Sequence, residues 1–224
     1  MAKKSDPFAI ELTPELVIRA YRAGIFPMAD DADTAELFWV APEERGIVPL
    51  EGLYVSKSLR KTLRTHPFAV RVDTDFDAVI SACAESASGR ETTWINGSIR
   101  QVYGELFRRG QVHTVEVWAG DDLVGGLYGL SIGAAFFGES MFHRRTDASK
   151  IALVHLVGRL NAGGYRLLDT QFITDHLASL GAIEIPRAEY ERRLGDALRH
   201  EGDWRALDNL PPASRSAPFR AGSV

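Results

Sequence analysis

The feature that most constrains the fold is an apolar, glycine-rich run at residues 123–142, LVGGLYGLSIGAAFFGESMF, which holds five glycines and a single charge. Gly125, Gly129 and Gly133 follow the GxxxG spacing that is typical of packed transmembrane helices. The uncharged part ends at Gly138, however, and is shorter than the ~20 residues that a membrane span requires. The run therefore does not predict a membrane helix.

The flanking residues predict a β-sheet instead. HTVEVW, at residues 113–118, alternates between apolar and polar side chains, which is strand periodicity. AGDD at 119–122 and SIGA at 131–134 have turn chemistry. We therefore expect three antiparallel strands, at 112–119, 123–132 and 135–142. Glycine inside a strand often marks a place where a ligand or another backbone comes close.

Composition narrows the protein class. The 224 residues are 45% hydrophobic and 25% charged, as in an ordinary globular protein with a sizeable core. The single cysteine, Cys83, excludes an internal disulfide and a cysteine-based zinc site. The six histidines show no ligand spacing, so no metal site is expected. The N-terminus lacks the apolar segment of a signal peptide, which predicts a cytoplasmic protein with no membrane partner.

One basic stripe stands out against a net charge of −4. Four cations follow the spacing i, i+3, i+4, i+7, which places them on one face of a helix: Lys57, Arg60, Lys61 and Arg64. Such a stripe can neutralise phosphates of a nucleic acid. The alternative is a solvated helix face, but such faces usually interleave acids, and residues 52–72 contain none.

The chain divides into three regions. Residues 1–66 are predicted to form a small N-terminal domain, with a helix that begins at Thr13-Pro14, turn-rich segments (IFPMADD and FWVAPEERGIVP) and the basic helix. Residues 67–200 form the second domain. Residues 201–224 are predicted to be a loose tail, because the end of the chain is rich in Pro, Ser and Ala.

After Pro67 the predicted element order is β-α-α-β-β-β-α-β-α-β, an α+β domain with a mixed sheet and flanking helices. This order is similar to that of the N-acetyltransferase (GNAT) superfamily, which also includes ligases that use aminoacyl-tRNA; the likeness concerns the fold alone. A CoA-dependent member would carry a glycine-containing pyrophosphate loop before the helix that follows its fourth strand. FHRRTDASK stands there instead, which disfavours a CoA enzyme.

Asp169 and Gln171 are the first candidate catalytic residues. They lie two apart in the predicted strand YRLLDTQF, so we expect their side chains to share a face. The carboxylate would orient the amide so that its oxygen accepts a hydrogen bond from an incoming amine. The alternative is a polar strand end in solvent.

Three further residues are candidates for substrate binding. Glu139 lies between apolar segments, where a carboxylate is costly unless it is paired. It would bind a substrate ammonium group or, alternatively, pair with Arg144, Arg145 or Lys150. Trp39 and Trp94 have loop-like contexts, in which tryptophan either stacks on a base or covers an edge of the core.

Several motifs together resemble those of the leucyl/phenylalanyl-tRNA–protein transferases, in the same order and over residues 12–195. The motifs are AYRAGIFPM, FWVAPEERGIVPL, SKSLRKTLR, TWI, GGLYGLSIGAAFFGESMF, ASK and LLDTQFITDHLASLGAIEIPR. The resemblance implies an enzyme that moves Leu or Phe from its tRNA to the N-terminal Arg or Lys of a protein, which marks that protein for degradation by the N-degron route.

The resemblance also implies roles for individual residues. Asp169 and Gln171 would assist loss of a proton from the acceptor ammonium, and Glu139 would lie at the aminoacyl site. Trp39 and Trp94 would lie near the terminal adenosine and the aminoacyl group, with Leu127 and Phe136 in the apolar pocket for the Leu or Phe side chain. No cofactor is expected, because an aminoacyl ester is already activated. The partners are leucyl- or phenylalanyl-tRNA and the acceptor protein, and a monomer is expected.

Two other functions stay open at this point: a CoA-dependent N-acetyltransferase, and a non-catalytic tRNA-binding module that would leave Asp169 and Gln171 without a purpose. The glycines of the sheet would let the aminoacyl end of the tRNA lie against the backbone. On this hypothesis, valine at Gly126 or Gly138 blocks donor binding while the protein stays folded.

Overall fold

The computed structural model describes residues 12–34, 36–85 and 92–210. Their elements, in chain order, are α1 (Pro14–Arg22), β1 (Phe26–Met28), β2 (Phe38–Val40), β3 (Glu44–Ile47), α2 (Lys57–Thr65), β4 (Ala69–Val72), α3 (Phe76–Ala84), α4 (Gly97–Arg108), β5 (Val112–Ala119), β6 (Asp122–Ile132), β7 (Ala135–His143), α5 (Ala148–Ala162), β8 (Leu167–Gln171), α6 (Asp175–Ala178), β9 (Ile183–Pro186), α7 (Arg187–Ala197) and α8 (Ala206–Asn209).

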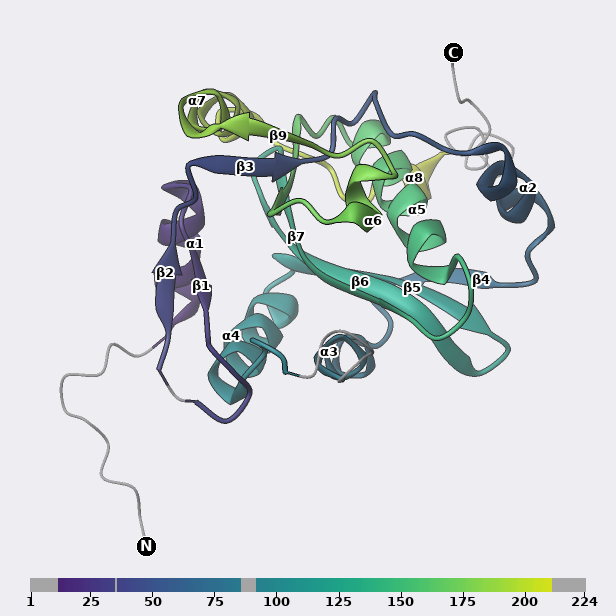
Figure 1. Ribbon diagram of the computed structural model, residues 1–224, viewed down its shortest axis with the longest axis horizontal. Coiled ribbons are helices and arrows are strands. Elements are labelled where there is room, and N and C mark those ends of the chain that lie inside the picture. Colours follow the sequence, from purple (N-terminus) through teal and green to yellow (C-terminus); the bar gives the residue numbers. More distant parts are fainter. Residues whose placement is uncertain (1–11, 35, 86–91, 211–224) are drawn as a thin grey trace, which may run out of the picture.

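A seven-stranded mixed sheet forms the centre, in the order β4-β5-β6-β7-β8-β3-β9. The β7–β8 pair is parallel, and the other neighbours are antiparallel. Helices α3 and α4 cover one face, while α5 and α6 lie on the other (Figure 1). Both faces carry an apolar core. The predicted α+β class, the element order after Pro67 and the three strands of the glycine-rich region are confirmed.

The N-terminal region contains strands that the sequence does not reveal. β1 and β2 form a two-stranded sheet in segments predicted to be turns, and each is only three residues long. Pro27 lies within β1, and proline counts against a strand in any pattern-based interpretation. β3 pairs with β8 and β9, so residues 44–47 belong to the large sheet although they precede residue 66. The domain boundary at residue 66 stays a prediction.

Most glycines of β6 serve close packing within the protein. A Cβ atom at Gly125 would lie 2.5 Å from the Cβ of Ala148, at the start of α5, and one at Gly126 would lie 2.9 Å from the carbonyl oxygen of Val115. At Gly129 the space is filled by the Phe136 ring. Gly126 therefore cannot serve as the predicted contact for a donor. Gly138 differs, because its nearest neighbour would be the Asp169 carbonyl oxygen at 3.5 Å.

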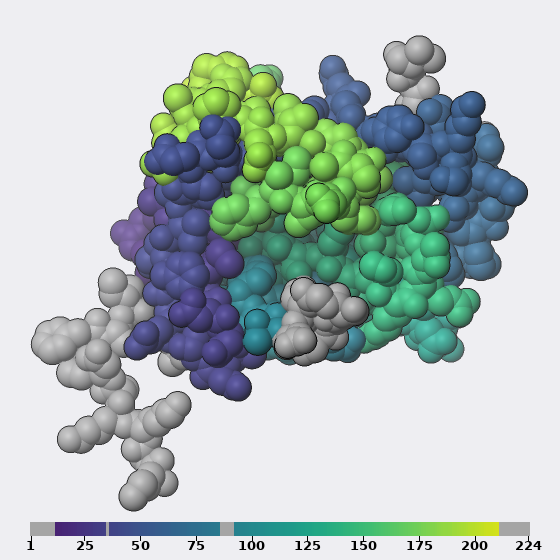
Figure 2. Space-filling view, in the orientation of Figure 1, coloured from purple at the N-terminus to yellow at the C-terminus, as the bar shows by residue number. Residues whose placement is uncertain are grey.

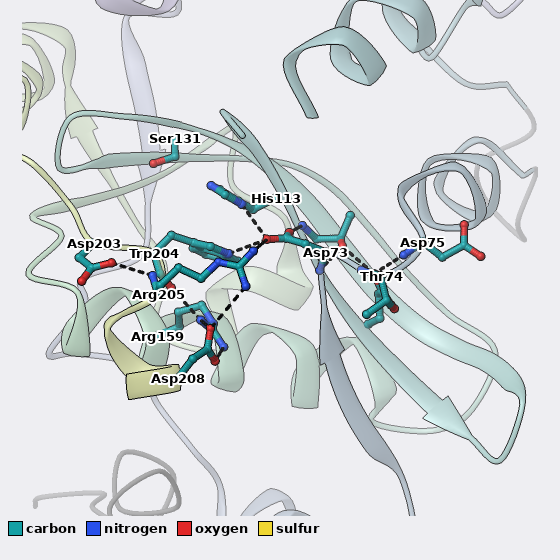
Figure 3. A network of polar contacts seen from close by, with 12 residues as sticks. Asp73, Thr74, Asp75, His113, Ser131, Arg159, Asp203, Trp204, Arg205 and Asp208 are labelled. Carbon is teal, nitrogen blue, oxygen red and sulfur yellow. Dashed lines mark hydrogen bonds and ion pairs between the residues drawn. The ribbon is translucent and has the colours of Figure 1, made fainter. Parts of the chain in front are cut away.

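The predicted loose tail does not begin at residue 201, because residues 201–210 fold onto the sheet (Figure 3). Trp204 is 5% exposed, stacks on His113 at 4.2 Å between ring centroids, and donates a hydrogen bond to Asp73 at 2.8 Å. Buried Arg159 pairs with Asp208 of α8 at 2.6 Å. A lone tryptophan in a polar stretch carries no periodic signal, so the sequence does not reveal this contact. The remainder of the predicted tail, 211–224, lies outside the described residues.

Within the described ranges, no helix combines the length and the apolar character needed to cross a membrane. The glycine-rich run at residues 123–142 forms β6 and β7.

Candidate active site

A cavity of about 300 Å³ lies where β6, β7 and β8 meet α5, α6 and the β1 strand. Figure 2 shows the molecule from this side, with the purple N-terminal strands to the left of the green segment that includes α6. One part of the wall is apolar: Leu127, Met141, Leu153, Leu156, Leu168 and Leu177. The polar part comprises Trp94, Glu139, Ser140, Thr170, Gln171 and His176. The cavity thus joins a hydrophobic compartment to a group of hydrogen-bonding side chains.

Asp169 is fully buried and held by four hydrogen bonds. Arg45 donates two, from Nε to Oδ1 at 2.9 Å and from Nη2 to Oδ2 at 2.6 Å. The Tyr190 hydroxyl donates to Oδ2 at 2.7 Å, and the backbone N–H of Gln171 donates to Oδ1 at 2.8 Å. The expected contact with the side-chain amide of Gln171 is not among these bonds. Asp169 holds the backbone of Gln171 instead.

Gln171 reaches the cavity because the strand ends in an unusual conformation. Leu168 and Thr170 line the cavity, while Asp169 between them bonds to Arg45 and Tyr190. Gln171 would continue the face of Asp169, but its φ of 58° breaks the alternation and its side chain lines the cavity. The Nε2 atom is buried, and no partner for it exists in the described part of the chain. The expectation of a shared face is therefore wrong.

Glu139 accepts hydrogen bonds from two tyrosines. The hydroxyl of Tyr21 donates to Oε1 at 2.8 Å and that of Tyr103 to Oε2 at 3.1 Å. Burial raises the pKa of Glu139 to about 8, against the opposing effect of the two hydroxyls. The alternative ion pairs are not formed with Arg144 or Lys150, which bond to Glu85 and Asp147. Glu139 thus presents a largely protonated carboxyl group to the cavity near neutral pH.

The other predicted binding residues divide into two pairs. Trp94 and Leu127 line the cavity. Trp39 lies in β2, opposite the cavity residue Pro27, and is 37% exposed. Phe136 is fully buried below the cavity wall, with its ring stacked 5.6 Å from that of Trp204. Phe136 is not among the residues that line the cavity, because the missing side chain of Gly129 leaves room for its ring inside the protein. Its place in the apolar pocket stays a prediction.

The four cations of the basic stripe, Lys57, Arg60, Lys61 and Arg64, are all exposed on α2. No carboxylate in the described ranges lies within ion-pairing distance of them. The helix lies beside α5, with Thr62 donating to Asp147 at 3.1 Å, and α5 contributes Leu153 and Leu156 to the cavity wall (Figure 1). The stripe is thus a free positive surface outside the cavity and beside one of its walls.

Sequence reasoning missed the residues that hold the site together: Tyr21, Arg45, Tyr103 and Tyr190. Each acts through a partner far away in the chain, such as the pair Arg45–Asp169, which is 124 residues apart. The one available signal is Arg45 itself, a cation placed before the apolar run GIVPL. Among the described residues, no three His, Cys, Asp or Glu side chains are grouped closely enough to hold a metal ion.

Comparison with known proteins matches both parts of the chain to one family. The model for leucyl/phenylalanyl-tRNA protein transferase matches residues 47–195, and the model for the N-terminal domain of that protein matches residues 10–43. A leucyl/phenylalanyl-tRNA–protein transferase of Afipia carboxidovorans is 56% identical over 209 residues, which is 93% of this chain and 92% of the relative. Another, from Rhodopseudomonas palustris, is 56% identical over 207 residues, 92% of each chain.

Proposed function

The chain belongs to the leucyl/phenylalanyl-tRNA–protein transferase family, and on this premise we propose that it moves leucine or phenylalanine from tRNA to the N-terminal Arg or Lys of acceptor proteins, marking them for N-degron degradation. The observation that carries the proposal is the cavity, in which six leucine and methionine side chains adjoin Trp94, Glu139 and Gln171. The apolar part suits the side chain of the donor, and the polar part suits the two amines and the ester.

The reaction needs alignment more than activation. The acceptor nitrogen attacks the ester carbonyl and a C–N bond forms. The bond between the carbonyl carbon and the ribose oxygen breaks, and the proton that the nitrogen loses passes to that oxygen, so the tRNA leaves with a free hydroxyl. Holding both reactants in line contributes roughly 7–11 kcal/mol. The side-chain carbonyl oxygen of Gln171 would accept a hydrogen bond from the incoming amine. Glu139 would lose its proton beside the ammonium form of a substrate amine and then act as its counter-ion. The ester already supplies the driving force, so no cofactor is required.

The apolar wall sets the choice of donor. Pockets of this kind distinguish side chains that differ by one methylene by only about 1–3 kcal/mol. Leu127, Met141, Leu153, Leu156 and Leu168 line this part of the cavity, and none of these side chains offers a polar contact. Leucine, phenylalanine and methionine should therefore all be accepted, whereas charged donors are excluded by the cost of desolvation.

The basic stripe on α2 would bind the body of the tRNA. Its four exposed cations lack carboxylate partners in the described ranges and lie beside α5, close enough to the cavity for one nucleic acid to contact both. Phosphate contacts of this kind supply affinity without sequence specificity. Trp94 would then stack on the terminal base within the cavity.

The test mixes the purified protein with radiolabelled leucyl-tRNA and a peptide that begins with Arg. A matched peptide with an acetylated N-terminus serves as the control. Transfer to the free amine alone, without ATP or CoA, is expected. Transfer that requires acetyl-CoA would instead support an N-acetyltransferase, and tRNA binding without transfer would support a binding module.

A further inference from the structure

We propose that Arg45 is a positioning residue for the transfer reaction: it fixes Asp169 and, through Asp169, the backbone turn that presents Gln171 to the cavity. The inference rests on the proposed function and adds to it a residue that does not itself touch the substrate. It also gives Asp169 a role different from proton transfer.

Arg45 has one possible orientation. Its side chain is 1% exposed, and its guanidinium lies between the rings of Phe26, at 4.6 Å, and Tyr190, at 4.5 Å. Nη1 donates to the carbonyl oxygen of Gly24 at 3.0 Å, while Nε and Nη2 bind the two oxygens of Asp169. Two ring contacts and hydrogen bonds from three nitrogens thus hold the guanidinium. A planar, bidentate cation held in this way fixes the direction of its carboxylate partner.

Asp169 has no capacity left for a substrate. A carboxylate offers about four acceptor positions, and Asp169 uses them for two bonds from Arg45, one from Tyr190 and one from the N–H of Gln171. Because its side chain is fully buried, no further donor reaches it. The hydrogen bond to the Gln171 backbone links its side chain to a residue of the cavity wall.

That link stabilises a conformation that glutamine otherwise avoids. Gln171 has a φ of 58°, which is uncommon for a residue other than glycine and persists only where the surroundings enforce it. The bond from its N–H to Asp169 Oδ1 is charge-assisted and 2.8 Å long. Arg45 holds that oxygen in place at 2.9 Å. Loss of the Arg45 geometry should therefore move Gln171 without altering the apolar wall that binds the donor.

The experiment compares the kinetics of Arg45→Lys with those of wild type. Lysine keeps the charge but loses the bidentate geometry. We expect kcat for leucyl transfer to fall about 10²-fold, since a displacement of about 1 Å has such an effect, while KM for leucyl-tRNA changes less than about threefold. The pH profile of kcat should keep its shape. Arg187→Lys is the matched control, because Arg187, at the start of α7, pairs with exposed Glu43 at 3.0 Å and neither residue lines the cavity.

A double variant separates positioning from direct chemistry. If Arg45 and Asp169 act through the same turn, Arg45→Lys with Asp169→Asn should be no more than about twofold slower than Asp169→Asn alone. The inference would be wrong if the kcat losses of the two single variants multiplied in the double variant. It would also be wrong if the pH range over which kcat rises or falls shifted in Arg45→Lys. Either result would mean that Asp169 takes part in proton transfer. An unchanged kcat in folded Arg45→Lys would also overturn the inference.

Further measurements separate a failure to fold, and a failure of the proposed function, from a failure of the inference about Arg45. If Arg45→Lys does not fold, Asp169→Asn decides, because it keeps the shape of the side chain and replaces one of the two oxygens that Arg45 binds with a donor; a lower kcat with unchanged KM for leucyl-tRNA and an unchanged pH profile supports the inference, and an unchanged kcat or a lost pH limb refutes it. Failure of wild type to transfer leucine would refute the proposed function. Normal transfer by wild type and by both variants would refute only the role of Arg45.

Discussion

At the scale of the single residue, Glu139 shows how packing sets a charge. Two tyrosine hydroxyls bond to its carboxyl group, yet burial outweighs them and raises its pKa to about 8. The hydroxyls of Tyr21 and Tyr103 also lie 2.6 Å apart, so the three groups form one closed cluster. A substrate ammonium that entered beside them would favour the ionised form and lower this pKa.

Glu139→Gln should flatten the dependence of stability on pH. The unfolded carboxyl loses its proton near its ordinary pKa of 4.5, and the folded one near 8. The folded state thus binds the proton more tightly, so wild type loses stability as the pH rises from 4.5 to 8. The amide cannot ionise. Denaturant titrations measure the free energy of unfolding at pH 5 and at pH 8. Its decline between the two should be at least about 1–2 kcal/mol larger in wild type than in Glu139→Gln. Equal declines in the two proteins would contradict the burial of Glu139.

Gly138→Val and Gly126→Val should separate a cavity residue from a packing residue. A Cβ at Gly138 meets only ordinary contacts, so that variant should keep the wild-type melting temperature and bind leucyl-tRNA about tenfold more weakly. At Gly126 it meets Val115 O at 2.9 Å and the Phe142 ring at 3.2 Å. That variant should lose about 1–3 kcal/mol of stability. Thermal melts measure the stability of the two variants, and filter binding measures their affinity for leucyl-tRNA. A Gly126→Val variant as stable as wild type would contradict the packing role of Gly126.

The sequence locates some residues of the site and misses others for a physical reason. Glu139, Gln171, Trp94 and Leu127 stand out because their neighbours in the chain are apolar or loop-like, and all four line the cavity. The partner of Asp169 cannot be found in this way, because Arg45 is 124 residues distant. The sequence also gives no sign that Gln171 has a φ of 58°.

At the scale of the element, α2 has a surface that its own fold does not use. Only Leu59 of this helix is buried, and Ser56 accepts a hydrogen bond from the Leu59 N–H at 3.1 Å to cap its N-terminus. The cations on its outer face contribute nothing to the core. They can therefore be replaced without loss of the fold.

The double variant Arg60→Ala/Arg64→Ala should weaken binding of leucyl-tRNA and leave the melting temperature unchanged. Each phosphate contact adds about 0.7–0.9 to the slope of log K against log salt, so the slope should fall by about 1–2. The matched control is Arg108→Ala/Arg192→Ala, which removes two cations that pair with acids of their own helices, Glu105 and Glu189. Equal slopes in the two variants would show that α2 does not contact the tRNA.

Elements were predictable where a pattern ran long enough. Strand β5 contains the alternating run HTVEVW, and the turn-forming residues at 119–122 and 131–134 mark the bounds of β6 and β7. The strands β1 and β2 have three residues each and exist because they pair with each other across about ten residues of intervening chain. A period cannot be read from three residues, so only tertiary structure reveals them.

At the scale of the whole molecule, the described C-terminal residues contact the sheet through Trp204 and helix α5 through Asp208 (Figure 3). Trp204 stacks on the rings of His113 and Phe136, and Asp73 accepts hydrogen bonds from the Trp204 indole and the Thr114 backbone. Trp204→Ala should therefore cost about 3–5 kcal/mol of unfolding free energy. Urea denaturation measures it, and Arg205→Ala, at an exposed neighbour, should cost less than 1 kcal/mol. A small loss at Trp204 would mean that this contact is weak.

The position of β3 in the sheet has a consequence for synthesis on the ribosome. β3 pairs with β8 and β9, so Arg45 must wait until residue 169 has emerged before it finds its partner. Translation at about 5–20 residues per second makes this delay roughly 6–25 s. A nascent or truncated chain that ends before β8 lacks the strands with which β3 pairs. The site around Arg45 and Asp169 therefore forms only after β8 and β9 have been synthesised.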